Sequence, residues 1–218
     1  MNKNFIFEDS GDNLIFIGDF DGLYENLADP WEQSGKSGSI QGYYAYSRKC
    51  LVNCLKEINP KTIAEVGCGL GYTTSIIGDQ LTECNILGID ISKVAIEKAK
   101  INFPKINFEN KDIADKNLKF NTQFDVIILN QLLWYILENI DVVFKNCWEN
   151  LSNDGCLVIS QAFLKEEQRY GREICDGFDG LINLIKTKHS NNFFLENFQY
   201  NLSQRYLHND GLIVLRKK

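Results

Sequence analysis

The sequence contains few of the residues that mark several common classes of protein. Its 218 residues include three prolines, one methionine and two histidines, His189 and His208. So little proline, with 16 glycines, excludes a collagen-like or proline-rich disordered chain. No apolar run reaches the roughly 18 residues of a membrane-spanning helix, and acidic residues interrupt the N-terminal segment before a signal peptide could form.

Cysteine and charge narrow the class further. Seven cysteines are present, none in a Cys-x-x-Cys pair, so neither a zinc site nor a disulfide framework is indicated. We expect no metal, and reduced thiols in a cytoplasmic protein. The 23 basic and 29 acidic residues give a net charge of −6, which disfavours nucleic acid as the partner. We also expect no membrane association.

From residue 62 onward, short apolar runs alternate with segments of helical pattern, which is typical of a mostly parallel sheet covered on both faces. The pattern predicts one doubly wound α/β domain with seven strands and a closing antiparallel C-terminal hairpin around Asn209-Asp210-Gly211. The predicted strands are 62–66, 85–89, 106–109, 124–129, 156–160, 198–202 and 212–215, and the predicted helices are 42–58, 72–81, 92–103 and 141–151. We divide the chain into an N-terminal extension or lid, 1–41, with short strands at 5–7 and 14–17, and the main domain, 42–218.

A glycine-rich turn follows the first strand of that domain. Gly67, Gly69 and Gly71 alternate between the strand and a helix, and glycine lets a ligand approach the backbone closely. The dinucleotide fingerprint fails, because its last glycine is replaced by Tyr72, and the lysine of a phosphate-binding loop is absent. Glu65, just before the turn, would repel a pyrophosphate but suits a ligand with an ammonium group.

Other candidate binding residues follow the next strands. Asp90 ends the second strand, 19 residues after Gly71, where a carboxylate can accept hydrogen bonds from both ribose hydroxyls. Asp112 could accept a hydrogen bond from an adenine amino group, and Ile91 and Ile113 could pack on the purine. Asn130 follows the fourth strand at the mouth of the sheet.

These motifs resemble those of the class I S-adenosylmethionine-dependent methyltransferases, which have a Rossmann-like fold. The resemblance covers roughly residues 45–160 and rests on five segments in order: 65–71, 88–92, 112–113, 124–135 and 153–159. It implies an enzyme of class EC 2.1.1.- that binds S-adenosylmethionine and releases S-adenosylhomocysteine. It places the three glycines, with Glu65, against the methionine part, Asp90 on the ribose and Asp112 on the adenine. The backbone carbonyl of Asn130 would contact the methionine ammonium.

The acceptor is expected to be a small molecule. Asn130-Gln131-Leu132-Leu133 differs from the Asp/Asn-Pro-Pro-Tyr/Phe of amino-methylating DNA enzymes with this fold. Asp29-Pro30-Trp31 is similar to a segment of methyltransferases resembling nodulation protein S, which methylate the nitrogen of an amino sugar. Tyr24, Trp31 and Tyr43 are therefore candidate substrate-binding residues. Arg169, Tyr170 and Arg172 are candidates for holding a phosphate or carboxylate.

Methyl transfer requires little acid–base chemistry, so few residues are diagnostic. Tyr135 and His189 are the candidate catalytic residues, with His208 and Glu166 as further candidate bases. We expect methylation of an amine that bears a phosphate, carboxylate or sugar, by a monomer or homodimer. Small-molecule O-methylation and a non-catalytic cofactor-binding subunit are the alternatives, and a nicotinamide oxidoreductase is disfavoured by Tyr72 and Glu65.

Overall fold

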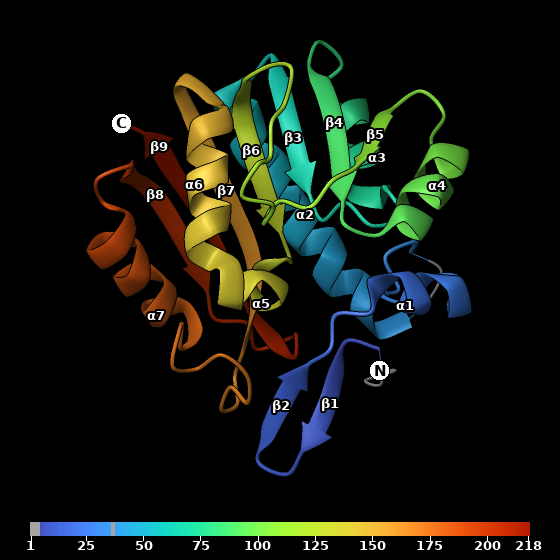
Figure 1. Ribbon diagram of the computed structural model, residues 1–218, viewed down its shortest axis with the longest axis vertical. Coiled ribbons are helices and arrows are strands. Elements are labelled where there is room, and N and C mark those ends of the chain that lie inside the picture. The colour runs from blue at the N-terminus through green and yellow to red at the C-terminus, as the bar shows by residue number, and fades with distance from the viewer. Residues whose placement is uncertain (1–4, 36–37) are drawn as a thin grey trace.

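A computed structural model of the protein describes residues 5–35 and 38–218, and its main feature is a seven-stranded sheet (Figure 1). The strand order is β5-β4-β3-β6-β7-β9-β8. The first five of these strands run parallel, and β9 pairs antiparallel with both β7 and β8. The strands are β3 Thr62–Val66, β4 Asn85–Asp90, β5 Asn107–Asn110, β6 Phe124–Asn130, β7 Leu151–Leu164, β8 Phe193–Asn201 and β9 His208–Lys217. The predicted fold class is confirmed.

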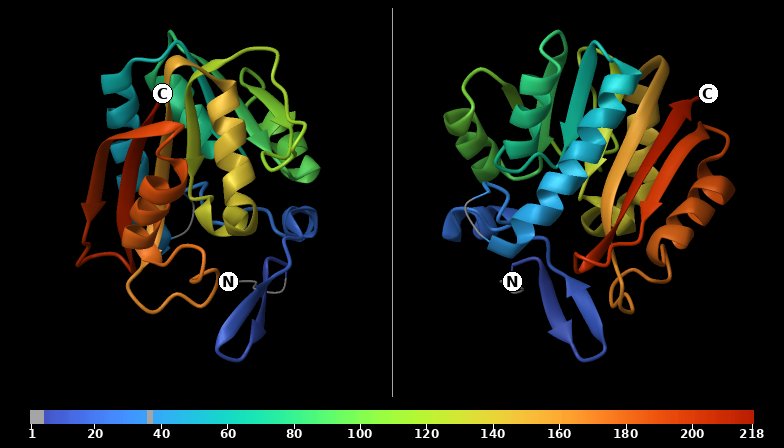
Figure 2. Two further views of the ribbon diagram at one scale, coloured as in Figure 1. Left: turned by 60° about the vertical axis from the view of Figure 1, so that its left-hand side comes forward. Right: turned by 180° about the vertical axis from the view of Figure 1, so that it is seen from behind.

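Helices cover both faces of the sheet (Figures 1 and 2). The helices are α1 Phe20–Asn26, α2 Gly38–Ile58, α3 Tyr72–Gln80, α4 Lys93–Asn102, α5 Leu133–Ile136, α6 Ile140–Asn150 and α7 Gly177–Leu184, with short turns η1 Leu137–Asn139 and η2 Ile185–His189. Ser92 caps α4 as predicted, because its hydroxyl accepts a hydrogen bond from Ala95 N at 3.0 Å. The remaining strands, β1 Phe7–Ser10 and β2 Asn13–Phe16, form a separate antiparallel hairpin.

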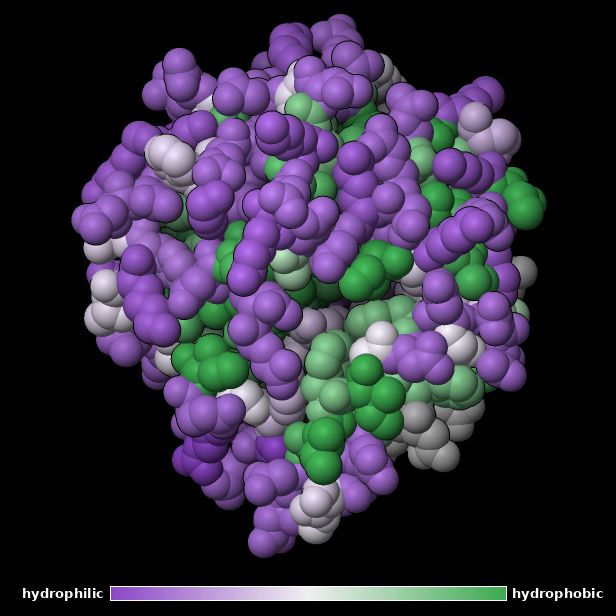
Figure 3. All heavy atoms as spheres, in the orientation of Figure 1, coloured by the Kyte–Doolittle hydropathy of each residue, from purple (hydrophilic) through white to green (hydrophobic). Residues whose placement is uncertain are grey.

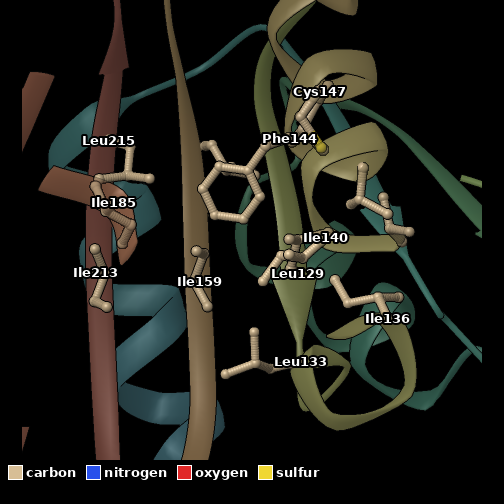
Figure 4. Packing of buried hydrophobic residues seen from close by; sticks show 14 of the residues in the cluster. Leu129, Leu133, Ile136, Ile140, Phe144, Cys147, Ile159, Ile185, Ile213 and Leu215 are labelled. Atoms are coloured by element: carbon tan, nitrogen blue, oxygen red, sulfur yellow. The ribbon is translucent and has the colours of Figure 1, made fainter. Parts of the chain in front are cut away.

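The alternating side chains of β6 show how the two faces of the sheet become buried. Val126 and Ile128 pack on the face covered by α2 and α3, whereas Ile127 and Leu129 pack on the face covered by α6 and α7. On the second face, α6 contributes Ile140, Phe144 and Cys147, which lie along one side of the helix (Figure 4).

Two predicted positions were wrong, namely the start of the first helix of the main domain and the turn of the C-terminal hairpin. The first helix of the main domain begins at Gly38, not at residue 42, and the Asn209-Asp210-Gly211 turn lies inside β9. The glycine serves packing there, because a Cβ on Gly211 would lie 2.6 Å from the Phe163 ring. The connection between β8 and β9 is instead formed by residues 202–207.

The parallel strands all end at the same edge of the sheet, and the N-terminal segments lie beyond that edge. Figures 1 and 2 show the β1–β2 hairpin and α1 below the carboxyl ends of β3 and β4. On the face drawn in Figure 3, apolar residues gather in the lower half, where these segments meet the sheet. In open α/β sheets, ligands bind at this carboxyl edge.

Among the described residues, no helix is both long and apolar enough to cross a membrane.

Phe144 provides a test of the core on the α6 face. It is fully buried, so Phe144→Ala should lower the free energy of unfolding by about 3–5 kcal/mol through lost apolar contact and a residual cavity. Urea unfolding followed by circular dichroism measures this change. Ile101→Ala is the matched control, because that α4 side chain is 79% exposed and its truncation should change little. Equal losses in the two variants would contradict this account of the core.

Candidate functional site

The glycine turn and the end of β4 form one connected structure. Gly67, Gly69 and Gly71 all have positive φ angles, of 70°, 53° and 82°, which residues other than glycine rarely adopt. The buried carboxylate of Asp90 accepts hydrogen bonds from Gly69 N and Ser92 N, each at 2.8 Å. Burial raises the pKa of Asp90 from 3.8 to about 6, and these two backbone donors oppose the shift.

Glu65 lies beneath the same turn and is almost completely buried. Its carboxylate accepts a hydrogen bond from the Thr74 hydroxyl at 2.6 Å and one from the Asn130 side chain at 3.3 Å. Burial raises the pKa of Glu65 to about 7, while these hydrogen bonds and the positive charge of Arg48 lower it. The structure thus brings Glu65, the Asn130 side chain and the glycine turn together.

The residues assigned to the adenine lie beside the end of β4. Ile91 is 53% exposed and Ile113 is buried. Asp112 is exposed, and its carboxylate accepts a hydrogen bond from Ala114 N at 2.8 Å. Asn146 of α6 fixes this loop, since its amide donates to the carbonyls of Ile113 and Asp115. Two isoleucines and a carboxylate therefore border the same edge as Asp90.

Aromatic rings from several segments gather next to the glycine turn. The hydroxyl of Tyr24 lies over Gly69, where an added Cβ would come within 2.6 Å of it, and it accepts a hydrogen bond from Trp31 Nε1 at 3.0 Å. The Tyr135 ring lies 5.7 Å from the Trp31 ring and 5.5 Å from the Phe20 ring. Burial raises the pKa of Tyr135. Its phenol therefore stays protonated near neutral pH.

Tyr43 belongs to a buried polar network at the ends of β6, β7 and β9. Its hydroxyl donates to Asp210 Oδ1 at 2.9 Å and accepts from Gln131 Nε2 at 3.2 Å. The Gln131 Oε1 accepts from Ala162 N at 2.9 Å, so both ends of the amide are held. Gln131 also has a positive φ of 55°, unusual for this residue, and the network stabilises that conformation.

The structure does not bring His189 to this site, so the prediction of a catalytic His189 was wrong. The side chain is buried on the α6 face of the sheet, with its ring 4.3 Å from the Phe144 ring. Its Nε2 lies 3.2 Å from the Asp141 carboxylate. Burial lowers the pKa of His189. It acts as a core residue here.

The geometry does not support an anion-binding role for Arg169 and Arg172. Arg169 contacts Asp9 at 3.0 Å and the backbone of the β1–β2 turn. Arg172 pairs with Glu167 and Asp176. Tyr170 lies at the edge of the aromatic group, with its hydroxyl 3.4 Å from Glu138 Oε1. Both guanidinium groups are thus engaged within the protein.

Arg48 was not among the predicted cofactor-binding residues, although it lies at the site. Its Nε donates to the Thr73 hydroxyl at 3.1 Å, and another nitrogen donates to the Gln33 carbonyl at 3.0 Å. Arg48 is the half-buried cation beside Glu65. In the sequence, only the position of Arg48 in a helix ahead of the glycine turn points to this site. How close that helix lies to the turn is set by tertiary packing.

Comparisons with known proteins place this arrangement in a class. The N-methyltransferase NodS from Bradyrhizobium japonicum with S-adenosylhomocysteine matches at a TM-score of 0.68 and 17% identity, covering 90% of this chain and 97% of that one. Magnesium protoporphyrin IX methyltransferase from Synechocystis with S-adenosylhomocysteine also has a TM-score of 0.68, with 14% identity over 90% and 97% of the two chains. The chain therefore has the fold of the class I S-adenosylmethionine-dependent methyltransferases.

The sequence comparisons are consistent with that fold. Residues 64–157 match the family model described as Methyltransferase domain, which confirms the resemblance to this class. A malonyl-[acyl-carrier protein] O-methyltransferase from Bacillus cereus is 33% identical over 128 residues, which are 56% of this chain and 45% of the relative. The corresponding enzyme from Acetivibrio thermocellus is 28% identical over 133 residues, which are 57% of this chain and 46% of that relative. The chain thus spans less than half the length of these curated relatives.

The raised pKa values of Glu65 and Asp90 predict how stability depends on pH. Both groups bind protons more tightly in the folded than in the unfolded protein, so the free energy of unfolding should fall as pH rises from about 4 to 7. Each group contributes a slope of at most about 1.4 kcal/mol per pH unit. In urea titrations, Glu65→Gln should make the fall between pH 5 and 7.5 shallower. The exposed Glu57→Gln should not, and identical slopes in the two variants would contradict the assignment.

Proposed function

We propose that this protein transfers the methyl group of S-adenosylmethionine to a small-molecule acceptor. The observation that carries the proposal is the joined structure of the left-handed glycine turn, Glu65 and Asp90 at the carboxyl edge of a class I methyltransferase sheet. The matched Methyltransferase domain spans the same residues. Both methyltransferase structures described above contain S-adenosylhomocysteine, which supports the same cofactor for this chain.

The residues present fit that cofactor. The positive φ angles favour glycine at these three positions, and because glycine has no side chain an amino acid group can approach the backbone of the turn closely. Asp90 keeps acceptor capacity beyond its two backbone hydrogen bonds, as ribose hydroxyls require. Ile91 leaves half of its apolar surface exposed at that point, where an adenine ring could cover it.

We assign the two ends of the cofactor to different residues. Gly67, Gly69, Gly71, Glu65 and the Asn130 carbonyl border the methionine part, and Arg48 supplies positive charge for its carboxylate. Asp90 takes the ribose, while Ile91, Asp112 and Ile113 border the adenine. The contacts of Arg48 with Thr73 and Gln33 use Nε and one terminal nitrogen, so the other terminal nitrogen can donate to a carboxylate.

S-adenosylmethionine supplies an electrophilic methyl group on a sulfonium, so the protein mainly positions the acceptor and excludes water. The rings of Tyr24, Trp31 and Tyr135 border the region next to the glycine turn. A protonated Tyr135 can donate a hydrogen bond to an acceptor atom, but at neutral pH it is a poor base. Such a site suits an acceptor that is already nucleophilic.

An amine is the acceptor that this surface fits best. Aromatic faces attract the ammonium centre that forms when an amine is methylated, and the buried carboxylate of Asp90 favours a positive charge nearby. The structural similarity to the N-methyltransferase NodS agrees with this choice. With Arg169 and Arg172 engaged elsewhere, an amino sugar is favoured over an amine carrying a phosphate or carboxylate.

Methylation of a carboxylate oxygen is the second candidate. It is favoured by the sequence similarity to malonyl-[acyl-carrier protein] O-methyltransferases. Their sequence identity to this chain, 33% and 28%, is higher than the 17% of NodS.

Substitutions at the two ends of the cofactor site should have different effects on two ligands. Asp90→Ala should raise the Kd of both S-adenosylhomocysteine and methylthioadenosine by about tenfold to hundredfold, the loss expected for hydrogen bonds to a charged acceptor. Arg48→Gln should weaken S-adenosylhomocysteine by about tenfold yet leave methylthioadenosine unchanged, because the latter lacks the amino acid group. Isothermal titration measures both constants, and the exposed neighbour Lys49→Gln is the control. Equal loss of both ligands in Arg48→Gln would refute its role.

The acceptor class can be tested with purified protein and S-adenosylmethionine. A panel of glucosamine, ethanolamine phosphate, a phenol, a thiol and malonyl-carrier protein is assayed for S-adenosylhomocysteine. We expect turnover of an amine, with a rate that rises with pH until the bound amine is deprotonated. Turnover confined to malonyl-carrier protein, without that rise, would establish the second candidate instead. If no acceptor were turned over although the protein bound S-adenosylhomocysteine, a non-catalytic cofactor-binding subunit would be favoured.

A further inference from the structure

We propose that the β1–β2 hairpin covers the acceptor side of the site, and that Arg169 is the positioning residue that holds the hairpin there. The inference rests on the proposed function in one respect, namely that acceptors bind beside Tyr135. It assigns to Arg169 a role other than the anion binding expected from sequence. It rests on two independent sets of contacts.

The first set joins Arg169 to the turn of the hairpin. The guanidinium contacts both carboxylate oxygens of Asp9, at 3.0 and 3.4 Å, and the carbonyls of Gly11, Asp12 and Asn13. The Arg169 carbonyl in turn accepts a hydrogen bond from Leu14 N at 3.1 Å. Arg169, in the loop after β7, therefore contacts the backbone of the hairpin turn and of the start of β2, and the Asp9 side chain of β1.

The second set lies between the hairpin and Tyr135. The rings of Phe7 and Phe16 lie 6.1 and 6.4 Å from the Tyr135 ring, and 5.1 and 5.9 Å from the Tyr170 ring. Tyr170 directly follows Arg169, so the same short segment contacts both the turn and the inner face of the hairpin. Tyr135 also touches Trp31 and Phe20, which border the glycine turn. The hairpin thus covers the aromatic group from the side away from the sheet.

Arginine is specifically required by this arrangement. Its planar group presents several donors at fixed angles and so can reach a carboxylate and three carbonyls at once, whereas a lysine ammonium cannot. The pair with Asp9 is about half exposed and by itself stabilises little. The carbonyl contacts should therefore account for most of the effect of Arg169.

Hydrogen–deuterium exchange on the whole protein tests the proposal without an acceptor. Arg169→Ala should speed exchange of the hairpin peptide 5–18 by about tenfold or more, since lost charged hydrogen bonds raise the open population. The Tyr135 peptide, 131–140, should lose protection with it. Arg169→Lys and Asp9→Asn should give smaller increases. Arg172→Ala is the matched control, because its partners Glu167 and Asp176 lie outside the hairpin.

Binding and turnover complete the test. In Arg169→Ala, the Kd of S-adenosylhomocysteine should stay within about twofold, because Arg169 touches no residue of the glycine turn, while the acceptor KM should rise more than kcat falls. Hairpin exchange equal to wild type would overturn the positioning role of Arg169. Faster exchange of the hairpin peptide together with unchanged exchange of the Tyr135 peptide would overturn the covering role of the hairpin. Absence of turnover in the wild type would count against the proposed function alone, because the exchange result stands without it.

Discussion

The buried carboxylate of Asp90 joins the two turns from which the candidate site is built. Its oxygens accept hydrogen bonds from Gly69 N and Ser92 N, so the turn after β3 and the turn after β4 cannot move independently. A carboxylate removed from water needs such donors, because an unpaired charge in this position would be costly. Asn110 and Asp21 bind the same β4–α4 connection from two other elements. The geometry offered to a ligand thus depends on one side chain.

The sequence predicted the central part of the fold because the relevant signals there are local. The β6 segment is apolar on both faces, Ser92 precedes a helix, and the glycines mark a turn that side chains disfavour. Helices α1, α5 and α7 were not predicted. They are short, from four to eight residues, and depend on packing against distant segments more than on their own pattern.

The candidate site divides along the same line. Glu65, Asp90 and Asn130 could be placed because parallel strands bring their carboxyl ends together, whatever the rest of the chain does. The positions of residues outside the strand ends could not be predicted by such a rule. His189 is a core residue, and Asp210 lies in a strand despite its turn-like sequence, because Tyr43 binds its carboxylate and Phe163 packs over Gly211. In both cases a tertiary contact outweighed local preference.

The contact between Arg169 and Asp9 also bears on how the protein folds. The two residues are 160 positions apart, so the hairpin at the start of the chain cannot dock until β7 and the loop after it have been synthesised. Closing so long a loop is entropically costly and slow. The rings of Phe7 and Phe16, which contact each other within the hairpin, therefore lack their contacts with Tyr135 and Tyr170 until those residues have been synthesised. Glu8, Asp9 and Asp12 place negative charge beside these rings, and charges next to an apolar segment disfavour its aggregation before it docks.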